Sequence, residues 1–195
     1  MPRPGCETAG VIDPMVLPPD LPEPADDGAA DHLPGTRMPG LALPATDGAA
    51  VDLSAREGRT IVYAYPWTGR PGQPLLDDDW DLIPGARGCT PETCGFRDHH
   101  AELAAEGAVV LGLSTQDTSY QQELVERLGL PFPILSDAEL RLKRALQLPA
   151  LEVAGQTLIK RLTLVVRDGA IEHVFYPVFP PDRHAGEVLA WLRDG

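Results

Sequence analysis

Residues 88–98 read Gly-Cys-Thr-Pro-Glu-Thr-Cys-Gly-Phe-Arg-Asp and contain two of the three cysteines of this 195-residue chain. Thr90 is typical of a helix N-cap and Pro91 of the first helical position. Cys89 is therefore expected at a helix N-terminus, where unpaired N–H groups and the helix dipole favour a thiolate. Cys94 follows five positions later and offers an oxidised sulfur a partner. The segment predicts thiol redox chemistry.

The spacing of Cys89 and Cys94 constrains how the two sulfurs can combine. In one regular helix they are separated by about 7.5 Å along the axis and point roughly 140° apart. A disulfide needs Cα atoms within roughly 7 Å and converging Cβ vectors. A bond between them therefore requires at least the first helical turn to unwind. This predicts a folded reduced form and a locally unfolded oxidised form.

Other interpretations of the cysteine pair remain open at this point. The two thiols can be buried structural residues. A metal site is disfavoured because zinc sites commonly use two-residue spacers and four ligands, and only His99 and His100 stand nearby. A disulfide oxidoreductase acting on protein thiols is disfavoured by the four-residue spacer, since such enzymes use Cys-x-x-Cys. The cap signature and the preceding Arg87 favour redox catalysis.

Composition and charge narrow the class of protein. With 43% apolar residues the chain is long enough for one full core plus an appendage. No segment has the apolar run of a membrane span, and the N-terminus lacks the apolar region of a signal peptide, so a cytoplasmic protein is expected. The net charge of −13 argues against nucleic acid and anionic membranes as partners.

Residues 1–36 differ in amino-acid composition from the rest of the chain. They hold eight prolines and seven acidic residues against one base. Such a segment is predicted to be an extended, mostly disordered tail, ahead of a single domain over residues 37–195. Alternatively, the apolar cluster at residues 11–17 can dock on the domain or on a partner. Cys6 lies in this tail, and we expect it to be incidental.

The domain alternates strands and helices before a late hairpin. Alternation implies parallel strands, and the hairpin adds an antiparallel pair to the same sheet, so an α/β fold with a mixed sheet and helices on both faces is expected. The predicted strands are 41–44, 51–53, 59–65, 109–114, 132–135, 157–166 and 170–176, and the predicted helices are 90–106, 118–128, 138–147 and 183–193.

Residues 88–98 resemble the active-site segment of the peroxiredoxins, most closely that of the bacterioferritin comigratory protein (Q-type) subfamily. The resemblance extends over most of residues 38–195. Its further motifs are Tyr-Ala-Tyr-Pro at 63–66, Val-Leu-Gly-Leu-Ser at 110–114, Pro-Ile-Leu-Ser-Asp at 133–137 and Lys-Arg-Leu-Thr-Leu at 160–164. The resemblance implies a thioredoxin-like fold and the reduction of hydrogen peroxide and organic hydroperoxides.

The resemblance also implies roles for individual residues. Cys89 is the peroxidatic thiolate, Cys94 the resolving thiol, and Arg161 the group that holds the thiolate and polarises the peroxide. An intramolecular disulfide then forms and is reduced by thioredoxin or a similar dithiol. Substrate contacts are assigned to Pro66 and Thr90, with Arg87 as an additional positive charge. No metal or organic cofactor is implied, and we expect a monomer or weak homodimer.

The chain departs from the subfamily just ahead of Cys89. The family has a proline seven residues and a threonine three residues before the peroxidatic cysteine, where this chain has Leu82 and Ala86. Pro66 resembles the displaced proline, which makes residues 67–88 an expected insertion in the active-site loop. Thr68 is then the nearest candidate for the missing threonine. A catalytically weak thioredoxin-fold module that recruits a partner through this loop stays a third possibility.

Overall fold

The computed structural model describes residues 13–195 and has a five-stranded mixed sheet at its centre. The strand order is β5-β4-β3-β8-β9, with β3 parallel to β4, β4 parallel to β5, and β8 antiparallel to both β3 and β9. The expected combination of early parallel strands and a late antiparallel hairpin is confirmed. The strands are β3 (Arg59–Ala64), β4 (Ala108–Ser114), β5 (Ile134–Ser136), β8 (Leu162–Arg167) and β9 (Ala170–Phe175).

The alternation of side chains along β3 divides the interior into two cores. Ile61 and Tyr63 point to one face of the sheet, while Val62 and Ala64 point to the other. All four side chains are buried, as a central strand between two covered faces requires. The sheet is therefore the middle layer of a three-layer molecule.

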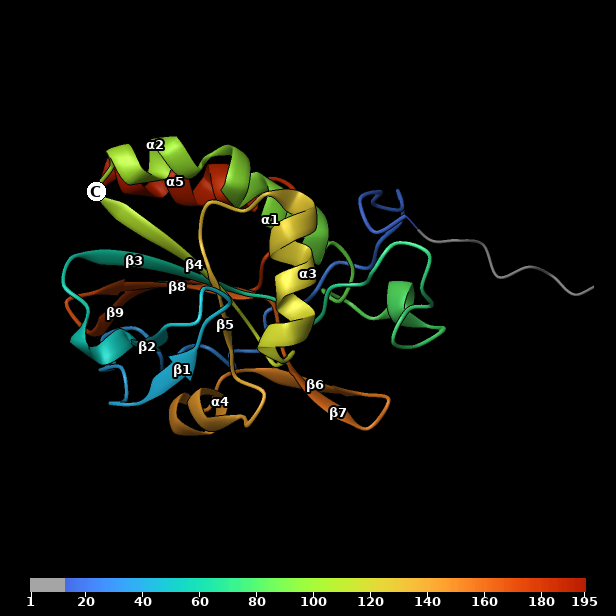
Figure 1. The fold of residues 1–195 in the computed structure, drawn as a ribbon, viewed down its shortest axis with the longest axis horizontal. Coiled ribbons are helices and arrows are strands. Elements are labelled where there is room, and N and C mark those ends of the chain that lie inside the picture. The colour runs from blue at the N-terminus through green and yellow to red at the C-terminus, as the bar shows by residue number, and fades with distance from the viewer. Residues whose placement is uncertain (1–12) are drawn as a thin grey trace, which may run out of the picture.

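Helices cover the first face of the sheet and mostly short hairpins cover the second (Figure 1). On the first face lie α1 (Cys89–Asp98), α2 (His100–Ala105), α3 (Thr118–Leu128) and α5 (His184–Asp194). On the second lie α4 (Arg141–Leu146), the pair β1 (Ala42–Pro44) and β2 (Ala50–Asp52), and the pair β6 (Ala150–Val153) and β7 (Gln156–Ile159). Two short 3-10 helices, η1 (Leu53–Ala55) and η2 (Trp80–Leu82), complete the elements.

Three predicted elements need correction. The helix expected over residues 90–106 is broken at His99, whose ψ of 4° separates α1 from α2. The strand expected over 157–166 is divided at Lys160 and Arg161 into β7 and β8, because β7 pairs with β6 in a separate hairpin. The helix expected over 138–147 is shorter and begins at Arg141 after Leu140 adopts a left-handed conformation.

The N-terminal segment, here defined as residues 13–36, lies against the domain. Leu33 is fully buried in the second core, and the backbone N–H of Gly35 donates to the carbonyl of Ile171 at 2.7 Å. Asp27 binds the Lys160 ammonium at 2.6 Å. The prediction of a loose tail is wrong for this segment, since its few apolar residues find places in the core. Residues 1–12, including Cys6, lie outside the described residues. No helix within residues 13–195 is long and apolar enough to span a membrane.

Candidate active site

Helix α1 begins directly after Gly88, at a position that requires glycine. Gly88 is the N-cap, with φ of 102°, and a Cβ there would collide with the ring of Pro181. Its carbonyl accepts the N–H of Glu92 at 3.0 Å, which makes Cys89 the first helical residue. The sequence-based prediction of Thr90 as the N-cap is therefore wrong, since Gly88 holds that position. The expected position of Cys89 at a helix N-terminus is confirmed.

Arg161 connects Cys89 to the loop that precedes it. Its Nη2 lies 3.2 Å from the Cys89 Sγ and also donates to the carbonyls of Arg87 at 3.0 Å, Ala86 at 3.3 Å and Gly85 at 3.4 Å. The thiol itself donates to the Ala86 carbonyl at 3.4 Å. Cys89 and Arg161 are both buried, so one guanidinium fixes the sulfur and the backbone around it.

Glu92 is a site residue that sequence reasoning did not identify. Its carboxylate pairs with the Arg161 guanidinium, and the two side chains are almost completely buried. The acid was visible as a first-turn residue typical of helix starts, but its burial depends on Arg161, which lies 69 residues away in the sequence. Burying a carboxylate is costly without a partner, so the ion pair explains why Glu92 is tolerated inside the fold.

Opposing effects act on the acidity of the Cys89 thiol. Burial raises the pKa of Cys89, because a dry surrounding disfavours the thiolate. The Arg161 guanidinium lowers that pKa, while the Glu92 carboxylate raises it. Burial also raises the pKa of Glu92, and Arg161 again acts in the opposite direction. Within this cluster, Arg161 is thus the group that favours the ionised forms of both Cys89 and Glu92.

Cys94 lies in the same helix but has quite different neighbours. It is a free thiol, as is Cys89, and both belong to the unbroken turns of α1. Its Sγ lies 3.9 Å from the Sδ of Met15 in the N-terminal segment. Burial raises the pKa of Cys94, and Arg97 opposes the rise. The reduced pair is therefore held in a helical arrangement that separates the two sulfurs.

Arg87 anchors the N-terminal segment to the active-site loop. Only 7% of Arg87 is exposed, and its guanidinium donates to the carbonyls of Asp13 at 2.8 Å and Val16 at 3.0 Å. It also pairs with Asp81 at 3.3 Å. The interpretation of Arg87 as an additional charge beside Cys89 is compatible with its place on the cavity described below, but its hydrogen bonds go to the segment and the loop.

The remaining predicted substrate contacts are placed unequally. Thr90 is buried and lines a small cavity with Cys89. Pro66 is buried at the end of β3 and does not line that cavity. Thr68, the candidate for the missing threonine, is held away from this role because its N–H and hydroxyl both donate to Gln116 Oε1, at 3.0 and 3.1 Å.

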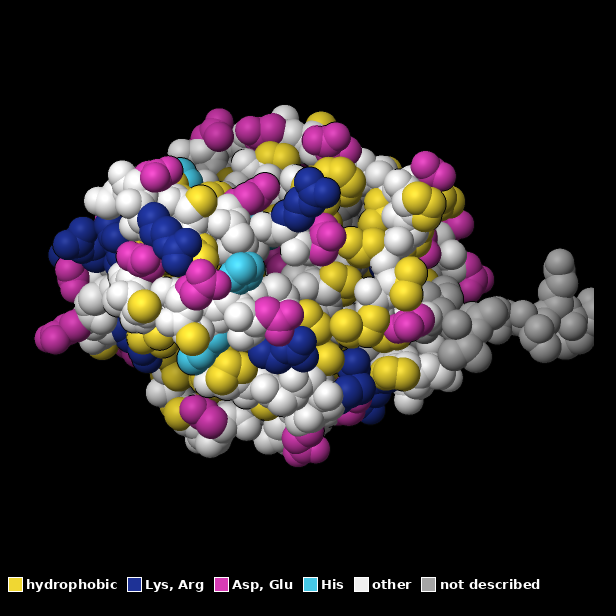
Figure 2. Space-filling model, turned by 90° about the horizontal axis from the view of Figure 1, so that it is seen from above, with side chains coloured by type: hydrophobic (Ala, Val, Ile, Leu, Met, Phe, Trp, Pro, Cys, Tyr) yellow, Lys and Arg dark blue, Asp and Glu magenta, His cyan; other side chains and the backbone are white. Residues whose placement is uncertain are grey.

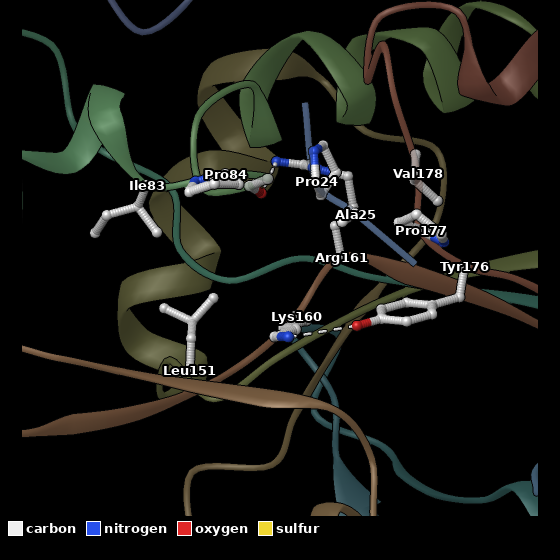
Figure 3. A pocket seen from close by; sticks show the side chains of 11 residues that line it. Pro24, Ala25, Ile83, Pro84, Leu151, Lys160, Arg161, Tyr176, Pro177 and Val178 are labelled. Atoms are coloured by element: carbon white, nitrogen blue, oxygen red, sulfur yellow. Dashed lines mark hydrogen bonds between the residues drawn. The ribbon is translucent and has the colours of Figure 1, made fainter. Parts of the chain in front are cut away.

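Several cavities lie near Arg161. One of about 10 Å³ is lined by Gly85, Arg87 and Arg161 among others. The smaller of the other two has a volume of about 20 Å³ and contains Cys89 and Thr90. The larger, about 220 Å³, is lined by Arg161, Lys160 and Tyr176 but not by either cysteine, and Lys160 donates to the Tyr176 hydroxyl at 3.4 Å (Figure 3). Seen from the helical face, apolar side chains gather on the half of the molecule that carries the N-terminal segment (Figure 2).

Comparison with known proteins gives the family. The sequence model of the family described as Redoxin matches residues 33–189. Peroxiredoxin Q, chloroplastic, from Oryza sativa subsp. japonica is 32% identical over 161 residues, which cover 82% of this chain and 66% of that protein, just under two thirds of its length. Peroxiredoxin Bcp from Escherichia coli is 32% identical over 153 residues, covering 76% of this chain and 87% of that protein.

Solved structures agree with this assignment. The crystal structure of peroxidoxin BcpB from Mycobacterium tuberculosis is 28% identical and covers 84% of this chain and 98% of its own, with a TM-score of 0.65. The Xanthomonas campestris bacterioferritin comigratory protein shares the fold at 24% identity, a TM-score of 0.61, and coverage of 90% and 98%. The thioredoxin-like peroxiredoxin fold expected from the sequence is thereby confirmed. The chain belongs to the peroxiredoxins of the Redoxin family, in the group that contains peroxiredoxin Q and Bcp.

Proposed function

We propose that the protein is a thiol peroxidase that reduces hydroperoxides, with Cys89 as the attacking sulfur and Cys94 as the resolving sulfur. The observation that carries this proposal is the contact of 3.2 Å between Arg161 Nη2 and Cys89 Sγ at the start of a helix. A cation and helix N–H groups both favour the thiolate, which is the nucleophile. Membership of the peroxiredoxin family supports the same reaction.

The first step is attack of the Cys89 thiolate on one oxygen of the peroxide. An S–O bond forms as the O–O bond breaks, and the second oxygen takes up a proton and leaves as water or an alcohol. The product on the enzyme is a sulfenic acid. Arg161 stabilises the negative charge that moves from sulfur to the leaving oxygen, and it does so without reorganising because the carbonyls of the loop already hold it.

The second step is attack of Cys94 on the sulfenic acid. The Cys94 sulfur displaces the hydroxyl, water is released, and a Cys89–Cys94 disulfide forms. Because α1 keeps the two sulfurs apart, its first turns must unwind before this bond can form. A dithiol reductant of the thioredoxin class then returns two electrons and two protons by thiol–disulfide exchange. The cycle uses no metal or organic cofactor.

The substrate contacts follow from the cavity at Cys89. Thr90 and Arg87 line it, and we assign them to peroxide binding. Pro66 acts at a distance from the peroxide, by setting the path of the chain between β3 and Trp67. The segment 67–88 remains our proposed insertion relative to the subfamily. Because the Thr68 hydroxyl is bound to Gln116, Thr90 is the threonine that lines the cavity together with Cys89.

Stopped-flow mixing with hydrogen peroxide tests the assignment. The reduced chain should lose its thiol rapidly and stoichiometrically, and Cys89→Ser should abolish this loss. Cys94→Ser should still react in the first step but accumulate sulfenic acid, detectable by trapping with a carbon nucleophile such as dimedone. Peroxide turnover that survives in Cys89→Ser contradicts the proposal. Saturation of the steady-state rate with thioredoxin, compared with glutaredoxin, tests the reductant.

A further inference from the structure

The cavity over Cys89 is small enough to discriminate between peroxides. Its volume is about 20 Å³, and a single water needs roughly 10–15 Å³ measured this way. It therefore holds the two oxygens of a peroxide and little more. Beside Cys89 its lining consists of Pro14, Trp67, Gly69, Leu75, Trp80, Arg87, Gly88 and Thr90.

Large apolar side chains on the loop form one wall of this cavity. Trp80 is 2% exposed and meets Trp67 edge to face, with ring centroids 5.8 Å apart. Leu75 packs against the same cluster. Two indole rings in contact have few alternative rotamers, so this wall does not retreat easily from a bulky ligand.

The N-terminal segment supplies another part of the wall. Pro14 lies between Asp13 and Val16, whose carbonyls accept hydrogen bonds from Arg87. Leu17 lies close to Gly88, since a Cβ on that glycine would stand 3.0 Å from Leu17 Cδ2. Residues 13–32 precede the part of the chain that matches the family model. This wall is therefore built by a segment outside the matched region.

The larger cavity is not a direct extension of the cavity over Cys89, because the cavity that shares Arg87 with one and Gly85 and Arg161 with the other has a volume of only about 10 Å³. The larger cavity shares no lining residue with the cavity over Cys89. Gly85 belongs to the lining of the larger cavity and Arg87 to that of the smaller, and the carbonyls of both are bound to Arg161. Figure 3 shows the large cavity with Pro24, Ala25 and Tyr176 around it and no thiol.

We propose that the walls over Cys89 make the chain selective for hydrogen peroxide over organic hydroperoxides with bulky tertiary substituents. Leu75, Trp80 and Pro14 are the specificity-determining residues. In hydrogen peroxide the leaving oxygen carries only a proton, whereas in cumene hydroperoxide it carries a branched carbon and a phenyl ring that must fit past these side chains on the open side of the cavity. This inference rests on the proposed peroxidase function and adds the substrate class to it.

The test measures second-order rate constants for Cys89 oxidation in the full chain by stopped flow, with hydrogen peroxide and with cumene hydroperoxide. We expect hydrogen peroxide to react about 100-fold faster, which is the order of discrimination that steric fit to a pocket provides. Leu75→Ala should lower the ratio of the two rate constants roughly tenfold. Pro14→Gly should lower it in the same direction. Leu82→Ala, at a residue of the same loop that is 71% exposed and outside the cavity lining, is the matched control.

The outcomes separate this inference from the function on which it rests. If cumene hydroperoxide oxidises the wild-type chain as fast as hydrogen peroxide does, the selectivity is absent and the inference fails while the peroxidase function stands. If the ratio of the two rate constants is unchanged in both Leu75→Ala and Pro14→Gly, these residues do not determine the selectivity and the inference fails. If neither peroxide oxidises Cys89 faster than it oxidises free cysteine, the proposed function itself fails.

Discussion

The two ends of the reactive part of α1 are held in opposite ways. At Cys89 the contacts come from the interior, because Arg161 directly precedes β8 of the central sheet and Glu92 lies in α1. At Cys94 the close contact is Met15, a residue 45% exposed in the N-terminal segment. The first sulfur is thus held by a buried ion pair in the interior, while the second is covered by a partly exposed side chain. Such a division suits a thiol that must be poised for one step and a thiol that must move in the next.

The largest effect is expected from removing the interior contact. Arg161→Met should lower the rate constant of Cys89 oxidation by hydrogen peroxide by roughly 10²–10³-fold, the usual loss when one preorganised donor to a developing charge is removed. Stopped-flow thiol loss measures it. Arg167→Met, at the far end of the strand that follows Arg161 and about half exposed, is the control and should leave the rate unaltered. A loss shared by both variants would mean that general charge, not the contact with Sγ, is responsible.

Oxidation should loosen α1 and leave the sheet intact. Formation of the disulfide should speed amide hydrogen exchange over residues 89–94 by roughly tenfold or more, because local unfolding exposes those N–H groups. Exchange in β3 and β4 should not change. Cys94→Ser treated with the same peroxide cannot form the disulfide and serves as control. Identical exchange over residues 89–94 in the reduced and disulfide forms would contradict the prediction that α1 unwinds on oxidation.

The pH profile of the first step should respond with opposite signs to the two charged neighbours of Cys89. Glu92→Gln removes a negative charge that raises the pKa of Cys89, so the pKa should fall and the rate should reach its plateau at lower pH. Arg161→Met removes a positive charge that lowers this pKa, so the rise should move to higher pH. Glu102→Gln, an exposed acid on α2, is the control. Shifts of equal sign in the two variants would contradict the charge cluster described for the site.

The smallest effect is expected from the peripheral contact. Met15→Ala removes a partly buried side chain over Cys94. The helical arrangement of the reduced pair should thereby lose roughly 1 kcal/mol of stabilisation. Disulfide formation after the first step should accordingly be up to about fivefold faster, as followed by the second phase of the intrinsic fluorescence change. Val16→Ala, at an exposed neighbouring side chain, is the control. A second phase slower in Met15→Ala than in the control would show that Met15 assists the movement of Cys94.

Local patterns predicted most of the fold and the centre of the site. The β-branched run before Tyr63 gave a buried central strand, and the helix after Asp117 was predicted with the bounds that it has. Cys89 and Cys94 were found from their spacing and surroundings alone. The role of Arg161 needed the resemblance to the family, because an arginine in an apolar strand has several explanations until its partners are known.

What the sequence did not reveal depends on contacts between distant segments. The burial of Glu92 follows from Arg161, and that of Arg87 follows from the carbonyls of Asp13 and Val16. The N-terminal segment was read as loose because proline and acidic residues dominate it. Its docking depends on a few particular positions, such as Leu33 in the core and Asp27 on Lys160, which composition does not reveal.

The position of Pro14 has a practical consequence for handling the protein. Pro14 lines the cavity over Cys89, whereas Gly195 lies at the opposite end of the molecule (Figure 1). An affinity tag, fluorophore or fusion partner on the N-terminal side of Pro14 is therefore connected to the chain beside this cavity, and one joined after Gly195 is not. Kinetic measurements on this enzyme should use a C-terminal tag or none, and an N-terminal fusion becomes a way to place a peroxide-generating or peroxide-reporting partner beside the reactive sulfur.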